Sequence, residues 1–303
     1  MIKVGCCGFP TSKKRYYEAF DLVELNSTFY NYPKTKLVEK WRTEALGGFE
    51  FTVKAHQDIS HNHMLDLSEE CIEAFERMKS ICEILDSKIL LVQTPSSFRP
   101  TPENMKRVRR FFSRIDRGRL MVVWETRGPD WDLPRMRNEL GRCLKELNVP
   151  HVTDPFRSMP TYTGKTAYFR LHGLGARMYY YQYSDMELKE LAAKVKPFEK
   201  KAEAVYVLFN NLSMFEDGLR FIQYLKTGTL PSVTGAVGLE SVRVLIEHTR
   251  YPIPKGKLSK LFGWRLVDWK KGEQIRLDEL LKKIPVKTYG SAYEVIEEIK
   301  RIM

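Results

Sequence analysis

The sequence predicts an α/β fold, an irregular TIM-like (β/α)8 barrel followed by a small α+β appendage. Two observations lead to this prediction. Eight short, mostly apolar runs recur along the chain, and such runs are typical of strands covered on both faces of a parallel sheet. Amphipathic stretches separate most of the runs, and eightfold alternation of strand and helix favours a closed barrel over its competitor, an open doubly wound sheet.

The predicted strands and helices follow one another in the order that a barrel requires. The eight strands are Ile2–Gly8, Asp21–Asn26, Phe49–His56, Lys88–Thr94, Leu120–Arg127, His151–Asp154, Ala167–His172 and Ala204–Asn211. Ser68 precedes the helical run EECIEAFERM, and Thr101 followed by Pro102 supplies a cap and a first helical residue. Ser184 and Ser213 each stand three residues before a glutamate, which is capping-box spacing.

The alternation changes at two places. Between Asp154 and Ala167 the segment PFRSMPTYTGKT is too short and too rich in proline, threonine and glycine for a helix, so we expect an irregular barrel there. After Lys226 the segment TGTLPSVTGAVG mixes glycine, proline and small residues, as domain boundaries do. We therefore expect a barrel over residues 1–227 and a small basic α+β domain over residues 228–303.

Composition and charge narrow the class of protein. With 43% hydrophobic and 29% charged residues, the 303-residue chain is expected to be globular rather than disordered. No apolar run approaches the roughly 18 residues of a membrane span, and the N-terminus has no signal-peptide core, so we expect a cytoplasmic protein. The five cysteines are an odd number without a C-x-x-C pair, which indicates free thiols rather than disulfides or structural zinc.

The chain carries a net charge of +12, which favours polyanionic partners such as DNA or RNA. Many basic proteins bind no nucleic acid, so the charge alone does not decide the partner. In the C-terminal segment, basic residues surround Trp264 and Trp269, an arrangement that suits phosphate contacts and base stacking. The alternative is two tryptophans in a small core with lysines on its solvated face.

Polar side chains recur at the carboxyl ends of the predicted strands. Four strands end in two polar residues separated by two positions, which places each pair on one face of its strand. The pairs are Glu24 and Asn26, Lys54 and His56, Glu125 and Arg127, and Arg170 and His172, and the single polar ends are Gln93, Asp154 and Asn210. Active sites of barrels lie at this end, so we expect a functional pocket there.

One interpretation of this pocket is an anion site. Lys54, Arg127 and Arg170 would converge as cations, and arginine can hold a phosphate with its planar fork. The neutral side chains expected to bind the same ligand are Asn26, Gln93, Asn210 and Asn211. The candidate catalytic residues are Glu24, Glu125, Asp154 and His172, of which the carboxylates could serve as general base.

The second interpretation is a metal site. His56 and His61, together with the carboxylates, are suitable ligands for zinc, manganese or magnesium, and metal-activated water is a standard route to phosphodiester cleavage. No local ligand spacing such as H-E-x-x-H supports this interpretation, and His61 could simply lie in a turn. No motif for a nucleotide cofactor is present.

The loop expected after the seventh strand, GLGARMYYYQYS, is rich in tyrosine. With Arg177 beside it, Tyr180 could belong to a mobile aromatic flap that stacks on a base or sugar of the substrate. Packing of these tyrosines against the adjacent loops is the alternative.

Six motifs resemble, in the same order, the strand motifs of the DUF72 family, the YecE-like proteins of uncharacterised function. They are VELNSTFY, the FTVKA segment that continues to His61, LLVQTPSSF, WETRGPDW, YFRLHG and VYVLFNN. The resemblance covers roughly residues 2–225 and implies a TIM-like barrel. The family usually has glutamate, phenylalanine, arginine and histidine on the fifth strand, whereas this chain has Glu125, Thr126, Arg127 and Gly128. The resemblance therefore does not extend to an imidazole after Arg127.

Together these features lead us to expect a hydrolase acting on a phosphate-containing substrate, with nucleic acid as the preferred choice and a nuclease-like reaction. Two alternatives stay open. The chain could be a non-catalytic module that binds nucleic acid or a partner through its basic C-terminal domain. It could also be a carbohydrate or sugar-phosphate enzyme with Glu24 and Glu125 as its carboxylate pair, whose separation would indicate retaining or inverting geometry.

Overall fold

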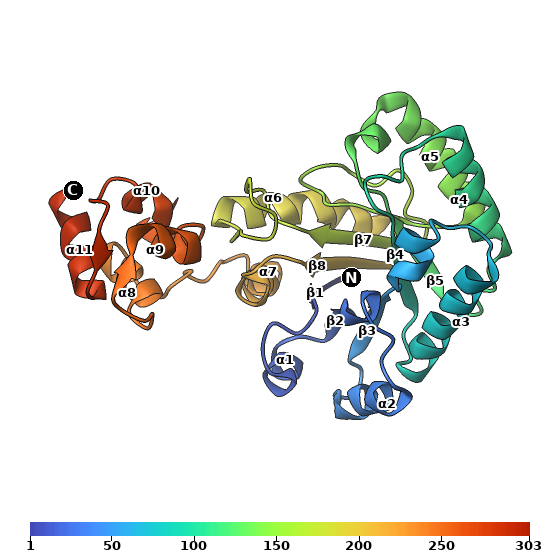
Figure 1. The fold of residues 1–303 in the computed structure, drawn as a ribbon, viewed down its shortest axis with the longest axis horizontal. Helices are drawn as coiled ribbons and strands as arrows, with labels where there is room; N and C mark the ends of the chain where they lie inside the picture. The colour runs from blue at the N-terminus through green and yellow to red at the C-terminus, as the bar shows by residue number, and fades with distance from the viewer. The chain divides into compact units, whose positions relative to one another are not determined.

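The computed structural model describes all 303 residues, which form two compact units (Figure 1). The first unit comprises Met1–Leu171 and Leu191–Asn210, and the second comprises His172–Glu190 and Asn211–Met303. The boundary expected from sequence, between residues 227 and 228, falls inside the second unit. The chain crosses from one unit to the other three times.

Eight parallel strands form the barrel of the first unit. They are β1 (Ile2–Cys7), β2 (Leu22–Leu25), β3 (Glu50–Lys54), β4 (Ile89–Gln93), β5 (Met121–Glu125), β6 (His151–Val152), β7 (Thr166–Leu171) and β8 (Ala204–Phe209). Their hydrogen-bonded order is β6-β5-β4-β3-β2-β1-β8-β7. A parallel bridge between Thr153 and Phe169 joins the two edges, so the sheet is a nearly closed barrel. The predicted TIM-like fold is confirmed, and each predicted strand overlaps one observed strand.

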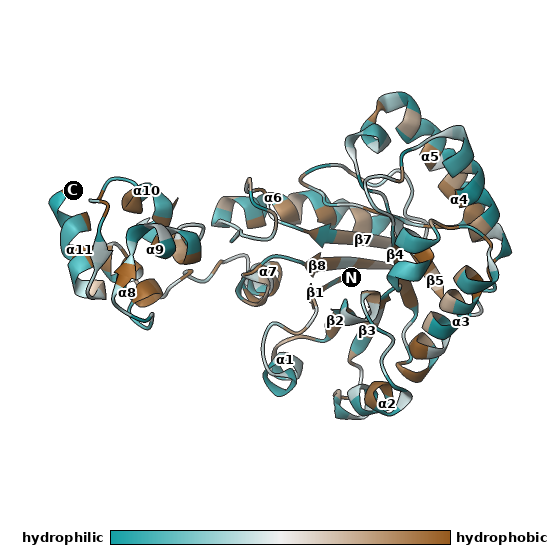
Figure 2. Cartoon of the chain, viewed as in Figure 1, coloured by the Kyte–Doolittle hydropathy of each residue, from teal (hydrophilic) through white to brown (hydrophobic).

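Amphipathic helices surround these strands (Figure 1). They are α1 (Lys13–Ala19), α2 (Thr35–Glu44), α3 (Glu69–Ile84), α4 (Pro102–Arg114) and α5 (Pro134–Leu147), with the short turns η1 (Ser27–Phe29), η2 (Asp58–Asn62), η3 (Pro129–Asp132) and η4 (Lys196–Lys200). Figure 2 shows hydrophilic and hydrophobic residues alternating along α3 to α5, as expected of helices with one face on a sheet. The predicted caps form at Ser68 and Thr101, whose hydroxyls accept the N–H groups of Cys71 and Asn104.

The irregular part of the barrel lies where the sequence predicts it. No helix forms between residues 153 and 165, and the chain folds back in turns instead. The N–H of His151 donates to the carbonyl of Tyr162, which holds this segment against β6. The strand before this segment, β6, is only two residues long.

The barrel interior alternates along each strand with a period of two. Leu22, Leu91, Val123 and Tyr168 belong to one buried cluster. Two residues after each of these comes a polar side chain, and those four are Glu24, Gln93, Glu125 and Arg170. Because successive side chains of a strand alternate between faces, the polar residues continue the inward-facing rows of the core.

The second unit has its own core of helices and two small antiparallel ladders. Its elements are the start of α6 (Asp185–Val195), α7 (Met214–Thr227), α8 (Leu239–Ile246), β9 (Ile253–Pro254), α9 (Lys255–Phe262), β10 (Leu266–Lys270), β11 (Glu273–Arg276), α10 (Leu277–Leu281), β12 (Thr288–Tyr289) and α11 (Ala292–Arg301). β10 pairs with β11, and β9 pairs with β12. Trp269 packs against the buried core of this unit.

Buried polar contacts explain why residues 172–190 belong to the second unit. The side-chain oxygen of Gln182 accepts the N–H of Leu266 at 2.9 Å, and its carbonyl accepts from Arg276 at 2.7 Å. Asp185 and Gln274 exchange two hydrogen bonds, of 2.9 and 3.0 Å. These partners are more than eighty residues apart in sequence, so no local sequence pattern predicts these contacts.

Two local predictions in this unit had different outcomes. The capping box at Ser184 is confirmed, because Glu187 accepts the N–H of Ser184 and donates its own N–H to the Ser184 hydroxyl. The capping box at Ser213 is wrong. Ser213 has ψ 22° and makes no side-chain cap hydrogen bond, whereas a capping side chain needs extended backbone. All five cysteines are free and buried, as predicted, and no helix has the length and hydrophobicity needed to cross a bilayer.

Candidate functional site

A buried arginine with two carboxylates lies at the carboxyl ends of the barrel strands. Arg170 donates from Nη2 to Glu24 Oε1 at 2.8 Å and from Nε to both Glu24 oxygens at 3.1 Å. Its Nη1 donates to Glu125 Oε2 at 2.6 Å. The three side chains are 1%, 0% and 4% exposed. Burial would lower the pKa of Arg170, but Glu24 and Glu125 outweigh it and raise that pKa well above its usual range.

Arg127 extends this network toward solvent. Its Nη2 lies 2.7 Å from Glu125 Oε1, and its side chain is 24% exposed. Glu125 therefore joins a buried arginine to a half-buried one. The two carboxylates and two guanidinium groups balance in charge, and this balance allows Arg170 to be buried with Glu24 and Glu125.

Lys54, at the end of β3, adds a positive charge that no carboxylate pairs with. Its Nζ lies 4.0 Å from the ring centre of Phe29, in cation–π contact. Burial lowers the pKa of Lys54 to about 8, and the positive charge of Arg170 acts in the same direction. The carboxylates of Glu125 and Glu24 oppose the shift without cancelling it. Lys54 is therefore the group of this cluster that can change protonation near neutral pH.

Neutral side chains complete the cluster. The side-chain oxygens of Gln93 and Asn26 each accept from Arg170 at 3.4 Å. The hydroxyl of Tyr168 donates to Glu24 Oε2 at 2.7 Å and lies 2.8 Å from the Thr52 hydroxyl. The sequence interpretation missed Tyr168 and Thr52. Each stands two positions before a predicted site residue, so the period-two spacing on β7 and β3 could have revealed both.

Other predicted site residues have local roles. The Oδ1 atom of Asp154 accepts the N–H of Phe156 at 3.1 Å, and its carbonyl accepts from Arg157 and Ser158, which stabilises the turn after β6. The N–H of Asn210 donates to the carbonyl of Leu171 at 2.8 Å, as part of the ladder between β7 and β8.

The two predicted metal ligands of the first unit have partners of their own. His56 accepts the N–H of Asp58 at Nδ1 and stacks on Tyr32 with ring centres 3.9 Å apart. His61 lies 2.8 Å from the Ser60 hydroxyl and packs edge-on against a phenylalanine ring. Burial lowers the pKa of His61 and the charge of Lys54 adds to it, which favours the neutral imidazole. No three histidine, cysteine or acidic side chains are arranged to hold a metal ion, and the metal site stays a prediction.

Three predicted residues lie in the second unit. Asn211 donates to the Tyr181 carbonyl at 2.9 Å and to Asp217 Oδ2 at 2.7 Å. His172 is buried, and its carbonyl accepts the N–H of Tyr179. Tyr180 lies in a pocket of that unit. The structure thus brings together Glu24, Asn26, Lys54, Gln93, Glu125, Arg127 and Arg170 at the end of the barrel.

The geometry limits what these groups can do. Glu24 and Glu125 both bind one guanidinium group, and Arg170 stands between them. A glycosidase pair needs open space for a sugar between its carboxyl groups. Anion binding by Arg127 and Lys54, which reach solvent, and proton transfer by Lys54 suit the arrangement better.

Known proteins resemble this chain over its barrel. The sequence model described as "Protein of unknown function DUF72" matches residues 11–232. The UPF0759 protein YunF of Bacillus subtilis is 25% identical over 228 residues, which cover 65% of this chain and 79% of that protein. The UPF0759 protein YecE of Escherichia coli (strain K12) is 32% identical over 91 residues, 30% of this chain and 33% of that protein.

Solved structures give the same result. A DUF72 family protein from Enterococcus faecalis V583 has a TM-score of 0.62 and 26% identity, and the alignment covers 75% of this chain and 97% of that one. A DUF72 family protein from Thermotoga maritima MSB8 has a TM-score of 0.63 and 24% identity, with coverage of 75% and 99%.

Proposed function

This chain belongs to the DUF72 family, whose function is unknown, and we propose from its own side chains that it is an enzyme that hydrolyses a phosphate ester at the end of its barrel. One observation carries the proposal. Lys54 and Arg127 stand at the outer edge of a buried, charge-balanced network, and burial lowers the pKa of Lys54 to about 8.

Charge favours a phosphate as the ligand. The inner carboxylates are neutralised by the two arginines, so a protonated Lys54 leaves one surplus positive charge at the site. Arg127 can place N–H donors on a phosphate, and Lys54 can act as a point charge beside it. Nucleic acid is the first substrate class to test, because the whole chain carries +12.

Because the pKa of Lys54 is about 8, its protonated and neutral forms are both populated near neutral pH; the proposed step uses the neutral amine as general base, with Arg127 as the cation beside the phosphate. Water attacks phosphorus, and Lys54 takes the proton that the water releases. The bond between phosphorus and the ester oxygen breaks, and the ammonium group of Lys54 returns the proton to the leaving alcohol. Glu24 and Glu125 hold the arginines in place and do not transfer the proton.

The test measures phosphate release and phosphodiester cleavage by the full chain. Substrates are aryl phosphates, nucleotides, DNA and RNA, each with magnesium, manganese or zinc. Lys54→Met and Arg127→Gln should each reduce turnover at least about 100-fold, the size of a lost general base or transition-state donor. Lys88→Met, an exposed lysine at the start of β4, is the matched control. Turnover that survives Lys54→Met, or no turnover of any substrate, would end the proposal.

Non-catalytic binding is the competing proposal, and one feature favours it. Both inner carboxylates are engaged by arginines, so the cluster could serve only to present Lys54 and Arg127 to an anion. Binding of phosphate compounds that is lost in both variants, with no turnover, would support this alternative. For either function we propose a cytoplasmic location, which the five free thiols support.

A further inference from the structure

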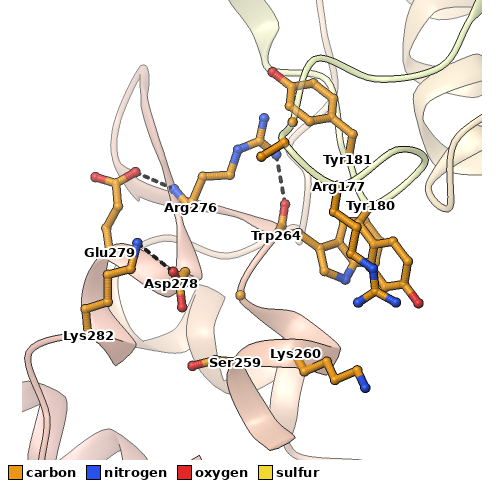
Figure 3. A pocket seen from close by; sticks show the side chains of 13 residues that line it. Arg177, Tyr180, Tyr181, Ser259, Lys260, Trp264, Arg276, Asp278, Glu279 and Lys282 are labelled. Carbon is orange, nitrogen blue, oxygen red and sulfur yellow. Dashed lines mark hydrogen bonds and ion pairs between the residues drawn. The ribbon is translucent and has the colours of Figure 1, made fainter. Parts of the chain in front are cut away.

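The second unit contains a pocket of about 530 Å³, and Tyr180 is the one predicted site residue among those that line it (Figure 3). The loop around residues 175–181 supplies one side, and the rest comes from α9 and the turn after it, the end of β11, and α10 with the residue that follows it. Most of those lining residues lie beyond residue 232, where the family match ends. The volume is in the range of pockets that bind small ligands.

One wall of the pocket is aromatic. Tyr180 meets Trp264 edge to face, with ring centres 6.1 Å apart and planes at 84°. The guanidinium group of Arg177 lies 3.3 Å from the centre of the Tyr180 ring. Figure 3 shows these three side chains grouped on one side. Both aromatic residues are half-buried, so part of each side chain is open to a ligand.

The charged side chains that line the pocket sum to +2, with four cations (Arg177, Lys260, Arg276 and Lys282) and two carboxylates (Asp278 and Glu279). Asp278 pairs with Lys282 at 2.8 Å, and Glu279 accepts the backbone N–H of Arg276 at 2.9 Å, on the side away from the aromatic wall (Figure 3). Arg177 and Lys260 also line the pocket, and neither has a carboxylate partner. Arg177 lies beside the Tyr180 ring, and both cations are available to an anion.

The walls are held in place before any ligand arrives. The Nη1 group of Arg276 donates to the carbonyls of Gln182 and Trp264 at 2.7 and 2.9 Å, and its guanidinium lies 4.2 Å from the ring centre of Tyr181. A side chain at Gly263 would come within 2.5 Å of the Ser259 carbonyl, so this turn needs glycine. A preformed pocket loses less entropy on binding.

We propose that this pocket binds a single nucleotide, with its base against Trp264 and Tyr180 and its phosphate on Arg177 and Lys260. Aromatic stacking combined with a cation is how proteins hold bases of a single strand, and the same chemistry holds a free nucleotide. The nucleotide can therefore be a free mononucleotide or one unit of single-stranded DNA or RNA. The site does not depend on the proposed reaction of the barrel.

The test titrates the full chain with mononucleotides and with labelled oligonucleotides of about ten residues, at about 50 and 200 mM salt, by calorimetry and fluorescence anisotropy. Trp264→Leu should weaken binding about 10-fold. Arg177→Gln and Lys260→Gln should each weaken it several-fold and lower the slope of affinity against salt by about 0.7 for a single strand. Arg177 is exposed, so its replacement leaves folding intact even if Trp264→Leu does not.

Lys271→Gln is the matched control, since Lys271 is an exposed lysine of the same unit outside the pocket. Mononucleotide binding that depends on the pocket residues supports a site for free nucleotides. Binding of oligonucleotides alone, with the same dependence, supports a single-strand site. Equal losses in Lys271→Gln and Arg177→Gln would show diffuse charge attraction and overturn the proposal, as would binding of neither ligand or preference for an acidic peptide.

Discussion

Arg170 is buried together with Glu24 and Glu125, and the cost of burying its charge depends on both carboxylates being present. Each of its terminal nitrogens donates to a carboxylate, through Glu24 and Glu125. A buried ion pair often adds little net stability, but removing one partner leaves an uncompensated charge. The network therefore fixes the side chains of the site more than it strengthens the fold.

Arg170→Met should lower the free energy of unfolding by about 3–5 kcal/mol, because Glu24 would remain buried without a cation and Glu125 would keep only Arg127. Urea unfolding measures this change. The triple variant that also carries Glu24→Gln and Glu125→Gln should recover part of the loss, since no buried carboxylate is left and the remaining cations, Arg127 and Lys54, are only partly buried. An Arg170→Met variant as stable as the parent chain would contradict the ion-pair network.

Lys54 should make the stability of the protein depend on pH. Its pKa is about 8 in the folded state and near 10.5 when unfolded. Between these values the unfolded state holds more protons, so the free energy of unfolding should rise with pH, by at most about 3 kcal/mol. Urea unfolding of Lys54→Met at pH 7.5 and 10 should lack this rise, and Lys88→Met should retain it. Identical pH dependence in the parent chain and Lys54→Met would contradict the low pKa.

Part of the site could be predicted from single residues and part could not. Glu24, Glu125, Arg127 and Arg170 were predictable because the period of a strand places such pairs on one face. The catalytic role expected of Asp154 stays a prediction, because a carboxylate that accepts an N–H group of its own turn has the same sequence pattern as a catalytic one. The direct ion pairs among the predicted residues also could not be read from spacing alone.

At the scale of elements, β6 is the shortest strand of the barrel. It contains two residues and carries His151, which is 2% exposed. His151 lies between Thr126 at 3.0 Å and the N–H of Thr161 at 3.3 Å. Burial lowers the pKa of His151 to about 4, and the charge of Arg137 adds to this shift.

His151 should make the protein sensitive to acid. Between pH 6.5 and 4 His151 is protonated in the unfolded state but not in the folded state. The free energy of unfolding should therefore decrease, by up to about 3 kcal/mol, as the pH is lowered through this range. Thermal unfolding at pH 7 and pH 4.5 measures this loss, which His151→Gln should reduce. His248→Gln removes an exposed histidine and should not. An unchanged acid response in His151→Gln would contradict the prediction.

The elements themselves were largely predictable, whereas the contacts between distant elements were not. Apolar runs and helix caps are local signals, and they placed all eight strands and the caps at Ser68, Thr101 and Ser184. The hydrogen bonds of Gln182 with Leu266 and Arg276 connect residues more than eighty positions apart. No periodicity encodes such contacts, so the extent of the second unit could not be predicted.

At the scale of the whole molecule, a deletion from Gly228 onward should destabilise the remaining chain. Gln182 and Asp185 would lose their partners on residues 266–276, and Arg220 would lose the carbonyl of Pro231. Each buried polar group left without a partner costs about 1–3 kcal/mol. Thermal unfolding should show a lower midpoint or a loss of cooperativity. Deletion of Ile302 and Met303, both exposed, is the control, and equal midpoints would contradict the prediction.

The three crossings of the chain between its two units have a consequence for how such a protein can change over evolution or in the laboratory. A module that is one continuous stretch of chain can be excised by one protease cut or moved by one gene fusion. Here the second unit is made of two separate stretches, His172–Glu190 and Asn211–Met303. Any recombination that transfers it intact must carry the intervening helix and β8 of the barrel with it.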